Sequence, residues 1–218
     1  MNFKINGILL INKLHKITSN DIINKIKKQI QNIKIGHLGT LDPSAIGLLI
    51  ISLYNNNIII KCLINKNKRY IIYALVGIKT FTKDLDGKIK FINKNILTTK
   101  YILLNNIIII QYQKQQTPPN FSSIKHNGIP LYKYSRLHIK LHQKQNNIII
   151  FKIKLLNIYK NLIILDIKCS KGTYIREIIN NLNIFKPVCT LKIIRISINN
   201  YTLLNSYDQN INLKNILY

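Results

Sequence analysis

The stretch Gly-His-Leu-Gly-Thr-Leu-Asp-Pro-Ser-Ala-Ile-Gly, residues 36–47, differs in character from the rest of this 218-residue chain. It holds three of the eight glycines and one of the five prolines. Because glycine and proline concentrate where a backbone turns sharply, we expect a shaped loop between Ile35 and Gly47. Within it, Pro43 restricts the backbone of Asp42 and can hold that carboxylate at a fixed angle in a pocket. An isolated Leu-Asp-Pro would more simply be a turn whose aspartate bonds its own backbone.

Regular elements are predicted on both sides of this loop. The apolar run Gly7–Ile11 is typical of a buried strand, and Thr18–Asp21 supplies helix-capping residues before a helical pattern. A second strand is expected at Leu48–Leu53. The helix would turn Ile22, Ile26 and Ile30 toward the core.

The middle of the chain predicts a hairpin followed by a helix. Residues Arg69–Gly77 have a strand pattern, and Lys88–Phe91 would be the hairpin partner across the turn Lys83–Gly87. Thr98–Gln111 has a helical pattern, which Thr117-Pro118-Pro119 ends.

The last third begins with a polar, aromatic and basic segment, Asn120–Leu141, which we interpret as an excursion from the core. Ile148–Lys160 and Leu162–Cys169 are two strong strand patterns. A turn at Ser170–Gly172, a helix with Ile175, Ile178, Ile179 and Leu182 on one face, and a strand from Pro187 to about Tyr201 complete the prediction.

The charge balance points to a polyanionic partner. Thirty-three Lys and Arg face only seven Asp and Glu, giving a formal net charge of +26. Part of this excess reflects a coding bias that also enriches Ile and Asn, because 29 of the basic residues are Lys. Arginine is therefore the more informative cation, as a candidate for two-pronged hydrogen bonding. The arginines are Arg69, Arg136, Arg176 and Arg195.

The cysteines and the hydropathy pattern limit the class of protein. Cys62, Cys169 and Cys189 lie far apart without metal-ligand spacing, so we expect reduced core residues and no metal site. No apolar stretch approaches the length needed to span a bilayer, and the first residues lack the layout of a signal peptide. We therefore expect a soluble, cytoplasmic protein.

Five blocks in a fixed order carry a more specific signal, and together they extend from about residue 7 to about residue 200. In this order they resemble the TruB family of tRNA pseudouridine synthases. The blocks are GILLINK (7–13), GHLGTLDPSAIGLL (36–49), KRYIIYALVGIKTFTKDLDG (68–87), TPPNFSSIKHNGIPLYKYSR (117–136), and CSKGTYIREI (169–178) with KIIRISI (192–198).

The resemblance implies an α/β (α+β) fold, with an extended, mostly antiparallel mixed sheet flanked by helices. One catalytic domain would occupy residues 1–218, and an insertion at about 117–141 would grip RNA. We expect no C-terminal RNA-binding extension. Ile194 departs from the family pattern, because many members have the first of two adjacent arginines there.

The implied activity is isomerisation of the T-loop uridine of tRNA, position 55 in standard numbering, to pseudouridine. Asp42 would be the catalytic carboxylate, and Arg176 would pair with it so that it stays ionised in the pocket. Without the resemblance, Arg176 could instead pair with Glu177 on a helix surface. Tyr70 would stack on the target base and lie near the proton transfer.

Four further residues are implied to bind the substrate: Lys13, His37, Tyr174 and Ile193. The target base is buried in the tRNA elbow and must be extruded, and His37 would contact the opened loop. The resemblance implies no cofactor and no metal. The expected partner is the T-arm and elbow of tRNA, with no membrane and no obligate protein partner, and the protein is expected to be a monomer.

Three other functions stay open at this point. A non-catalytic RNA-binding or tRNA-folding protein would keep the same fold and charge. A glycosidase would need two carboxylates facing each other across a sugar, and the chain offers no convincing second one. Metal-dependent hydrolysis would need ligand spacing that the five histidines and seven acids do not show.

Overall fold

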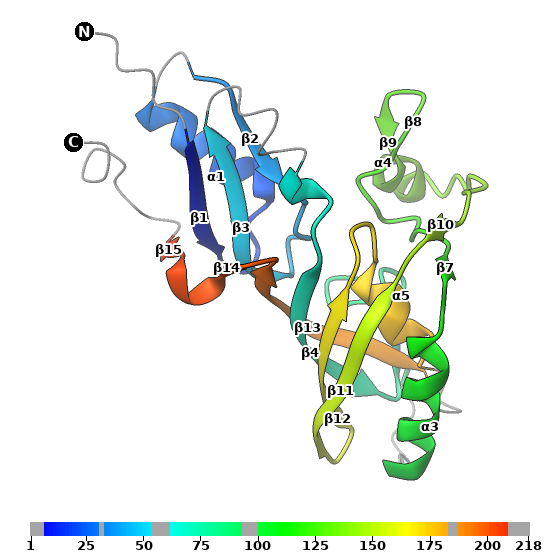
Figure 1. Ribbon diagram of the computed structural model, residues 1–218. Helices are drawn as coiled ribbons and strands as arrows, with labels where there is room; N and C mark the ends of the chain where they lie inside the picture. Colours follow the sequence, from blue (N-terminus) through cyan, green and yellow to red (C-terminus); the bar gives the residue numbers. More distant parts are fainter. Residues whose placement is uncertain (1–6, 31–32, 54–61, 93–99, 183–186, 209–218) are drawn as a thin grey trace, which may run out of the picture. The chain divides into compact units, whose positions relative to one another are not determined.

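The computed structural model describes residues 7–30, 33–53, 62–92, 100–182 and 187–208. The chain forms two compact units (Figure 1). The first unit comprises residues 1–71 and 193–218, and the second comprises residues 72–192. The prediction of one catalytic domain over 1–218 stays a prediction, whereas the predicted mixed α/β fold is confirmed.

The sheet of the first unit is built around β3 (Ile46–Leu53), which is buried along almost its whole length. β1 (Gly7–Lys13) pairs with it antiparallel from Gly7 opposite Leu53 to Lys13 opposite Gly47. β2 (Ile35–Leu38) pairs antiparallel with the same strand. β3 and β1 lie side by side in Figure 1, and both confirm predicted strands.

Part of a long strand and two short strands extend this sheet. The last part of β13 (Val188–Ile198) runs parallel to β3, with Arg195 opposite Gly47. β14 (Tyr201–Thr202) pairs antiparallel with β13, and β15 (Tyr207–Asp208) lies parallel to β1 after the short helix η1 (Leu203–Asn205). The core here includes Leu38, Leu48, Ile50, Leu63 and Ile198.

Helix α1 (Ser19–Gln29) begins at the predicted capping residues. Thr18 is the N-cap, its side chain accepts from the Asp21 amide, and the Asp21 carboxylate accepts from the Thr18 amide. These reciprocal bonds satisfy amides that the first helical turn leaves unpaired. Ile22, Ile23 and Ile26 are buried, while Ile30 is the half-buried C-cap.

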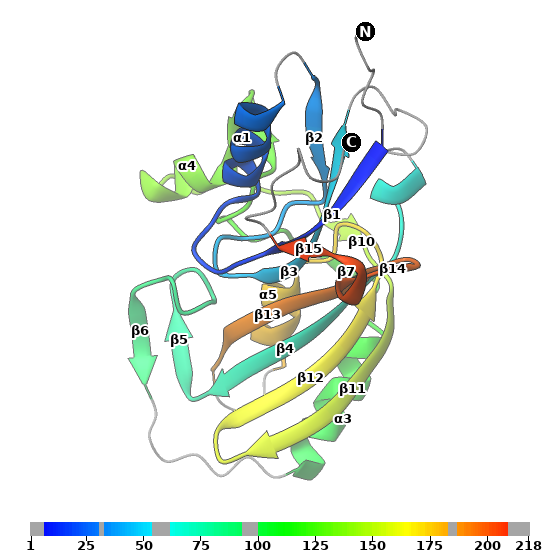
Figure 2. The same cartoon turned by 90° about the vertical axis from the view of Figure 1, so that its left-hand side faces the viewer.

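The second unit contains the two predicted long strands as an antiparallel pair, β11 (Ile150–Tyr159) and β12 (Leu162–Cys169) (Figure 2). In the sheet, β12 is followed by β4 (Lys68–Val76) and then β13. Helix α3 (Lys100–Gln111) contacts β11, which confirms the predicted helix over its described residues; Thr98 and Thr99 lie outside them. Helix α5 (Ile175–Asn180) is buried except at its last residue.

The structure corrects four details. The expected loop at 35–47 begins with a strand, β2, because its first four residues complete a ladder with β3. The hairpin partner of β6 (Ile89–Ile92) is β5 (Ile78–Thr80) rather than β4, because Gly77 with φ of 89° separates β4 from β5. The last strand ends at Ile198, where Asn199 turns with φ of 51°. Cys62 is exposed, whereas Cys169 and Cys189 are buried free thiols.

The insertion at 117–141 lies between two short paired strands, β7 (Gln115–Gln116) and β10 (Asn146–Asn147). It contains the small hairpin β8 (Lys125–His126) and β9 (Ile129–Pro130), followed by helix α4 (Leu131–Arg136). Among the described residues, no helix combines the length and apolar character that crossing a membrane requires.

Candidate functional site

The Asp42 loop, residues 39–45, is fixed by hydrogen bonds to five consecutive carbonyl groups. Two of these carbonyls, those of Gly39 and Thr40, accept from the two terminal nitrogens of Arg195 at 3.0 and 2.9 Å. The carbonyl of Asp42 itself accepts from the Ala45 amide at 3.0 Å, closing a tight turn. Buried carbonyls without partners are costly, so these bonds favour one loop conformation.

Helix α1 supplies the bonds to Leu41 through Ser19. Its hydroxyl oxygen lies 3.1 Å from the Leu41 amide, from which it accepts, and 3.3 Å from the Leu41 carbonyl, to which it donates. Ser19 is 2% exposed and Leu41 is 4% exposed. The first turn of α1 therefore holds the residue directly before Asp42.

Lys13, at the end of β1, holds the other side of the loop. Its ammonium group donates to the carbonyls of Leu14, Ile17 and Pro43 at 3.1, 2.7 and 3.3 Å, and the side chain is fully buried. The Pro43 carbonyl also accepts from the Lys16 amide at 2.9 Å. The structure thus places Lys13 beside the loop, bonded to backbone carbonyls, and its role in binding substrate stays a prediction.

Asp42 is half-buried at the middle of this anchored segment. The residues on both sides have their carbonyls bound to buried side chains, so the backbone that carries the carboxylate is held from two directions. Such support is what a catalytic side chain on a loop requires.

Tyr70 belongs to β4 and is 6% exposed. The guanidinium carbon of Arg195 lies 5.7 Å from the centre of its ring, within the range of a cation–π contact. One arginine therefore touches both the Asp42 loop and Tyr70. Ile193, the other predicted pocket residue of the first unit, is buried on β13 two positions before Arg195.

His37 lies on β2, half-buried. Burial, followed by the nearby positive charge of Arg195, lowers the pKa of His37 below 6.5. The imidazole is therefore neutral at pH 7. Its Nδ1 atom is buried and has no hydrogen-bond partner within the described part of the protein.

In the second unit, Arg176 on α5 joins three segments. Its guanidinium donates to the carbonyls of Thr82 and Phe121 at 2.9 and 2.8 Å and lies 3.4 Å from a carboxylate oxygen of Asp84. Arg176 and Asp84 are each 5% exposed. The guanidinium is therefore oriented by the 80–87 turn and by the start of the insertion.

The neighbouring Glu177 has its own partner. Lys83 lies 2.7 and 2.5 Å from the two carboxylate oxygens of Glu177, which is 6% exposed. Glu177 is thus paired with Lys83, and within this unit Arg176 forms an ion pair with Asp84.

Tyr174 is the N-cap of α5 and half-buried. Its amide donates to the side-chain oxygen of Gln116 at 2.8 Å, and its carbonyl accepts from the Gln116 amide group at 3.1 Å. Gln116, which directly precedes the insertion, therefore connects it by hydrogen bonds to the start of α5, the helix that carries Arg176.

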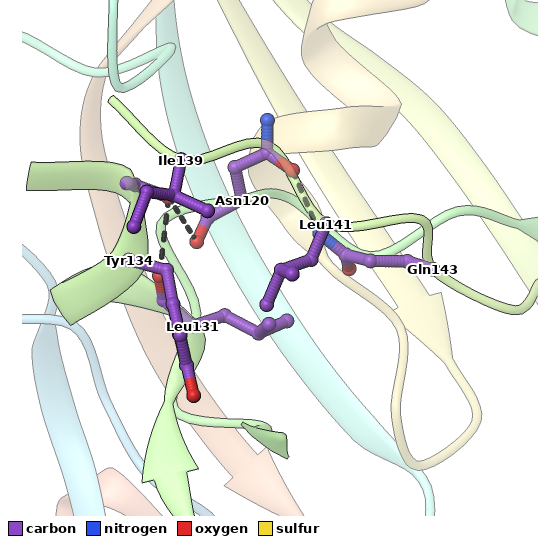
Figure 3. Close-up of a pocket in the computed structure, with 7 residues that line it drawn as sticks. Asn120, Leu131, Tyr134, Ile139, Leu141 and Gln143 are labelled. Carbon is purple, nitrogen blue, oxygen red and sulfur yellow. Dashed lines mark hydrogen bonds between the residues drawn. The ribbon is translucent and has the colours of Figure 1, made fainter. Parts of the chain in front are cut away.

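The insertion has a small apolar centre of its own (Figure 3). A shallow, half-open hollow lies here, beside the side-chain bonds of Gln143 to Asn120 at 2.7 Å and of Ser135 to the Asn120 carbonyl at 2.8 Å. No predicted site residue lines it. The lining residues are Asn120, Leu131, Tyr134, Ser135, Ile139, Leu141 and Gln143.

Aromatic and basic side chains lie on the outside of the insertion. Arg136 is exposed and lies 5.4 Å from the Tyr132 ring centre, and His126 meets Tyr134 edge to face at 6.0 Å. Such mixed surfaces suit phosphates and unstacked bases.

The predicted residues therefore divide between the units: Lys13, His37, Asp42, Tyr70 and Ile193 belong to the first, and Tyr174 and Arg176 to the second. Four contributors were not assigned to the site from sequence: Ser19, Asp84, Gln116 and Arg195. For two of them the sequence offered a signal, because their residue types are rare in this chain: Arg195 is one of four arginines, and Asp84 is one of seven acidic residues. Within the described ranges, no three His, Cys, Asp or Glu residues lie together as a metal site would require.

Comparison with solved structures identifies the class of fold. A chain in the crystal structure of a Cbf5-Nop10-Gar1 complex matches with a TM-score of 0.65 at 19% identity, over 88% of this chain and 48% of that one. A chain in an H/ACA RNP bound to a substrate RNA containing 2′-deoxyuridine matches with a TM-score of 0.64 at 15% identity, over 93% and 50%. The fold is that of the pseudouridine synthases.

Residues 27–175 match the model of the N-terminal domain of the TruB family pseudouridylate synthases, and the chain belongs to this family. The tRNA pseudouridine synthase B of Blochmanniella pennsylvanica is 41% identical over 181 residues, 83% of this chain and 69% of the relative. That of Wigglesworthia glossinidia brevipalpis is 41% identical over 209 residues, 94% and 64%. That of Buchnera aphidicola is 37% identical over 184 residues, 82% and 57%. The chain thus spans between 57 and 69% of the length of these relatives.

Proposed function

We propose that this chain is a tRNA pseudouridine synthase that isomerises the T-loop uridine at position 55, with Asp42 as the catalytic carboxylate. The observation that carries the proposal is the anchored Asp42 loop, in which every carbonyl from Gly39 to Pro43 has a hydrogen-bond partner. Relatives of the same family carry the name tRNA pseudouridine synthase B.

The reaction needs no outside reactant. The bond between the ribose C1′ and the uracil N1 breaks, the uracil turns, C1′ bonds to C5, and the proton on C5 moves to N1. A carboxylate can start this sequence by attack at the sugar or by removing a sugar proton. Either role requires that Asp42 is ionised and that it is held at a fixed position. The anchored loop supports the fixed position.

Arg176 is proposed to pair with Asp42. A cation beside a carboxylate favours its ionised form in a pocket that excludes water. Support comes from the buried guanidinium, which the Thr82 and Phe121 carbonyls and Asp84 already orient within the second unit.

Tyr70 is proposed to stack on the target base, and Tyr174 and Ile193 to line the uridine pocket. His37 is proposed to contact the RNA loop from which the base has been extruded. A half-buried, neutral imidazole supports this role, because one nitrogen of a neutral imidazole can accept a hydrogen bond from RNA.

Binding is proposed to rest on the T-arm and elbow of tRNA, gripped by the insertion and attracted by the positive field of the chain. The protein is proposed to act in the cytoplasm as a monomer without an obligate protein partner. If phosphate contacts dominate, binding weakens steeply with salt, by roughly a factor of 10³ or more between 50 and 200 mM for six or more contacts.

The decisive experiment follows tritium release from a T-arm transcript labelled at uridine C5, because the C5–H bond breaks only when C5 joins the ribose. The wild type should release tritium, and Asp42→Asn should bind the transcript equally but release none. Asp86→Asn, which changes an exposed aspartate in a turn, is the matched control and should react like the wild type. A wild type that binds without reacting would make the chain a non-catalytic RNA-binding protein.

A further inference from the structure

We propose that Arg195 is a positioning residue for this reaction, which sets the Asp42 loop and the Tyr70 ring in a fixed relation through one guanidinium group. The inference rests on the proposed function, because it concerns the same site. It adds a residue that acts through the Asp42 loop and Tyr70, which it contacts.

The chain brings Arg195 to the loop through a close contact of two strands. Arg195 on β13 lies opposite Gly47 on β3 in a parallel pair. A β-carbon on Gly47 would lie 2.4 Å from the Arg195 carbonyl oxygen and 2.9 Å from its amide nitrogen, and Gly47 has φ of 102°. Only glycine permits this approach and this backbone conformation together.

The guanidinium then meets two acceptors that a single ammonium group serves poorly. Its terminal nitrogens donate separately to the carbonyls of Gly39 and Thr40, at 3.0 and 2.9 Å. These carbonyls belong to the residues three and two positions before Asp42. A planar two-pronged donor fixes both the distance and the orientation of this segment.

The same group also contacts Tyr70. Its guanidinium carbon lies 5.7 Å from the ring centre, and Arg195 is 1% exposed. A movement of the guanidinium therefore displaces the catalytic loop and the tyrosine ring together. In a chain with 29 lysines and four arginines, a buried arginine with these three contacts has a geometry that lysine does not reproduce.

The competing explanation is that Arg195 only stabilises the fold. The two explanations differ in which kinetic parameter changes, because a misplaced catalytic group lowers kcat while a less stable but folded protein keeps it. Arg195→Lys keeps the charge and most of the side chain but has one donor nitrogen where the guanidinium has two that bond separate carbonyls. We expect it to lower kcat by roughly 10²-fold and to leave the Kd for T-arm RNA within about 2-fold.

Two further variants make the comparison complete. Gly47→Ala leaves the arginine intact but forces its backbone away, so it should lower kcat with the same small effect on Kd. Ile163→Ala opens a cavity at a fully buried position of β12 and is the control for lost stability alone. It should lower the melting temperature and leave kcat, measured well below that temperature, unchanged.

The outcomes separate the two proposals. An inactive wild type would overturn the proposed function itself, whatever the variants do. With an active wild type, folded Arg195→Lys and Gly47→Ala proteins that keep kcat within about 3-fold would overturn the positioning role. If neither variant folds, Arg195 is a residue of the structural core and the positioning role is overturned as well. If only one variant folds, the kcat of that variant decides whether the positioning role holds.

Discussion

Replacing Ser19 by Ala should loosen the Asp42 loop at one defined point. The change removes the hydroxyl that lies 3.1 Å from the Leu41 amide and 3.3 Å from its carbonyl, in a place where Leu41 is only 4% exposed. Leaving a buried polar group unsatisfied costs about 1–3 kcal/mol, and the longer of the two bonds contributes less, so we expect a loss of about 3 kcal/mol in the free energy of unfolding.

Urea unfolding followed by circular dichroism would measure this loss as a lower midpoint with an unchanged slope. For a chain of this length the same loss lowers Tm by about 6–12 °C. Asn20→Ala is the control, because it changes the next, exposed residue of the same helical turn. A Ser19→Ala protein as stable as the Asn20→Ala protein would show that the hydroxyl does not hold the loop.

Three further measurements test other parts of the structure. Thr18→Ala should destabilise the protein by about 1 kcal/mol, because it removes the N-cap side chain of α1. It should also raise the pKa of Asp21, which hydrogen bonds from the Thr18 hydroxyl and amide lower. An Asp21 titration that the substitution leaves unchanged would contradict the capping box. The pKa of His37 lies below 6.5 in the folded protein, so the unfolded chain binds more protons as the pH falls through 6.5. The free energy of unfolding that depends on this group is therefore fully present above pH 6.5 and declines below it. His37→Gln should therefore flatten the dependence of Tm on pH between about 7 and 5, and an identical slope would refute the assignment. A thiol reagent applied to the native protein should label Cys62 alone, because Cys169 and Cys189 are buried and burial raises the pKa of Cys189. Mass spectrometry would measure the labelling, and label on Cys169 or Cys189 would contradict the prediction.

The sequence predicted best those elements whose causes are local. The start of α1 followed from Thr18 and the residues after it, because a capping box is complete within four positions. β11 and β12 followed from long apolar runs separated by one turn. The loop with Asp42 was recognisable because glycine and proline mark it directly.

Partners distant in sequence could not be derived from local patterns. Gln116 bonds Tyr174 across 58 positions, and no feature of either neighbourhood indicates the other. The pairing of β6 was wrong because its pattern fits any adjacent strand, and the conformation of Gly77 decides which one is in reach. The resemblance to a family named Asp42, Tyr70 and Arg176, but the bonds that hold them came from the fold.

The geometry of the acceptors explains which cation the chain uses at three buried positions. At Arg176 and Arg195 two separate carbonyls are served by two nitrogens of one planar group, Thr82 with Phe121 and Gly39 with Thr40. At Lys13 three carbonyls converge on one nitrogen, which suits the three donors of an ammonium group. A coding bias that favours lysine explains part of the lysine excess but not this division. The buried arginines therefore mark places where orientation, and not charge alone, is required.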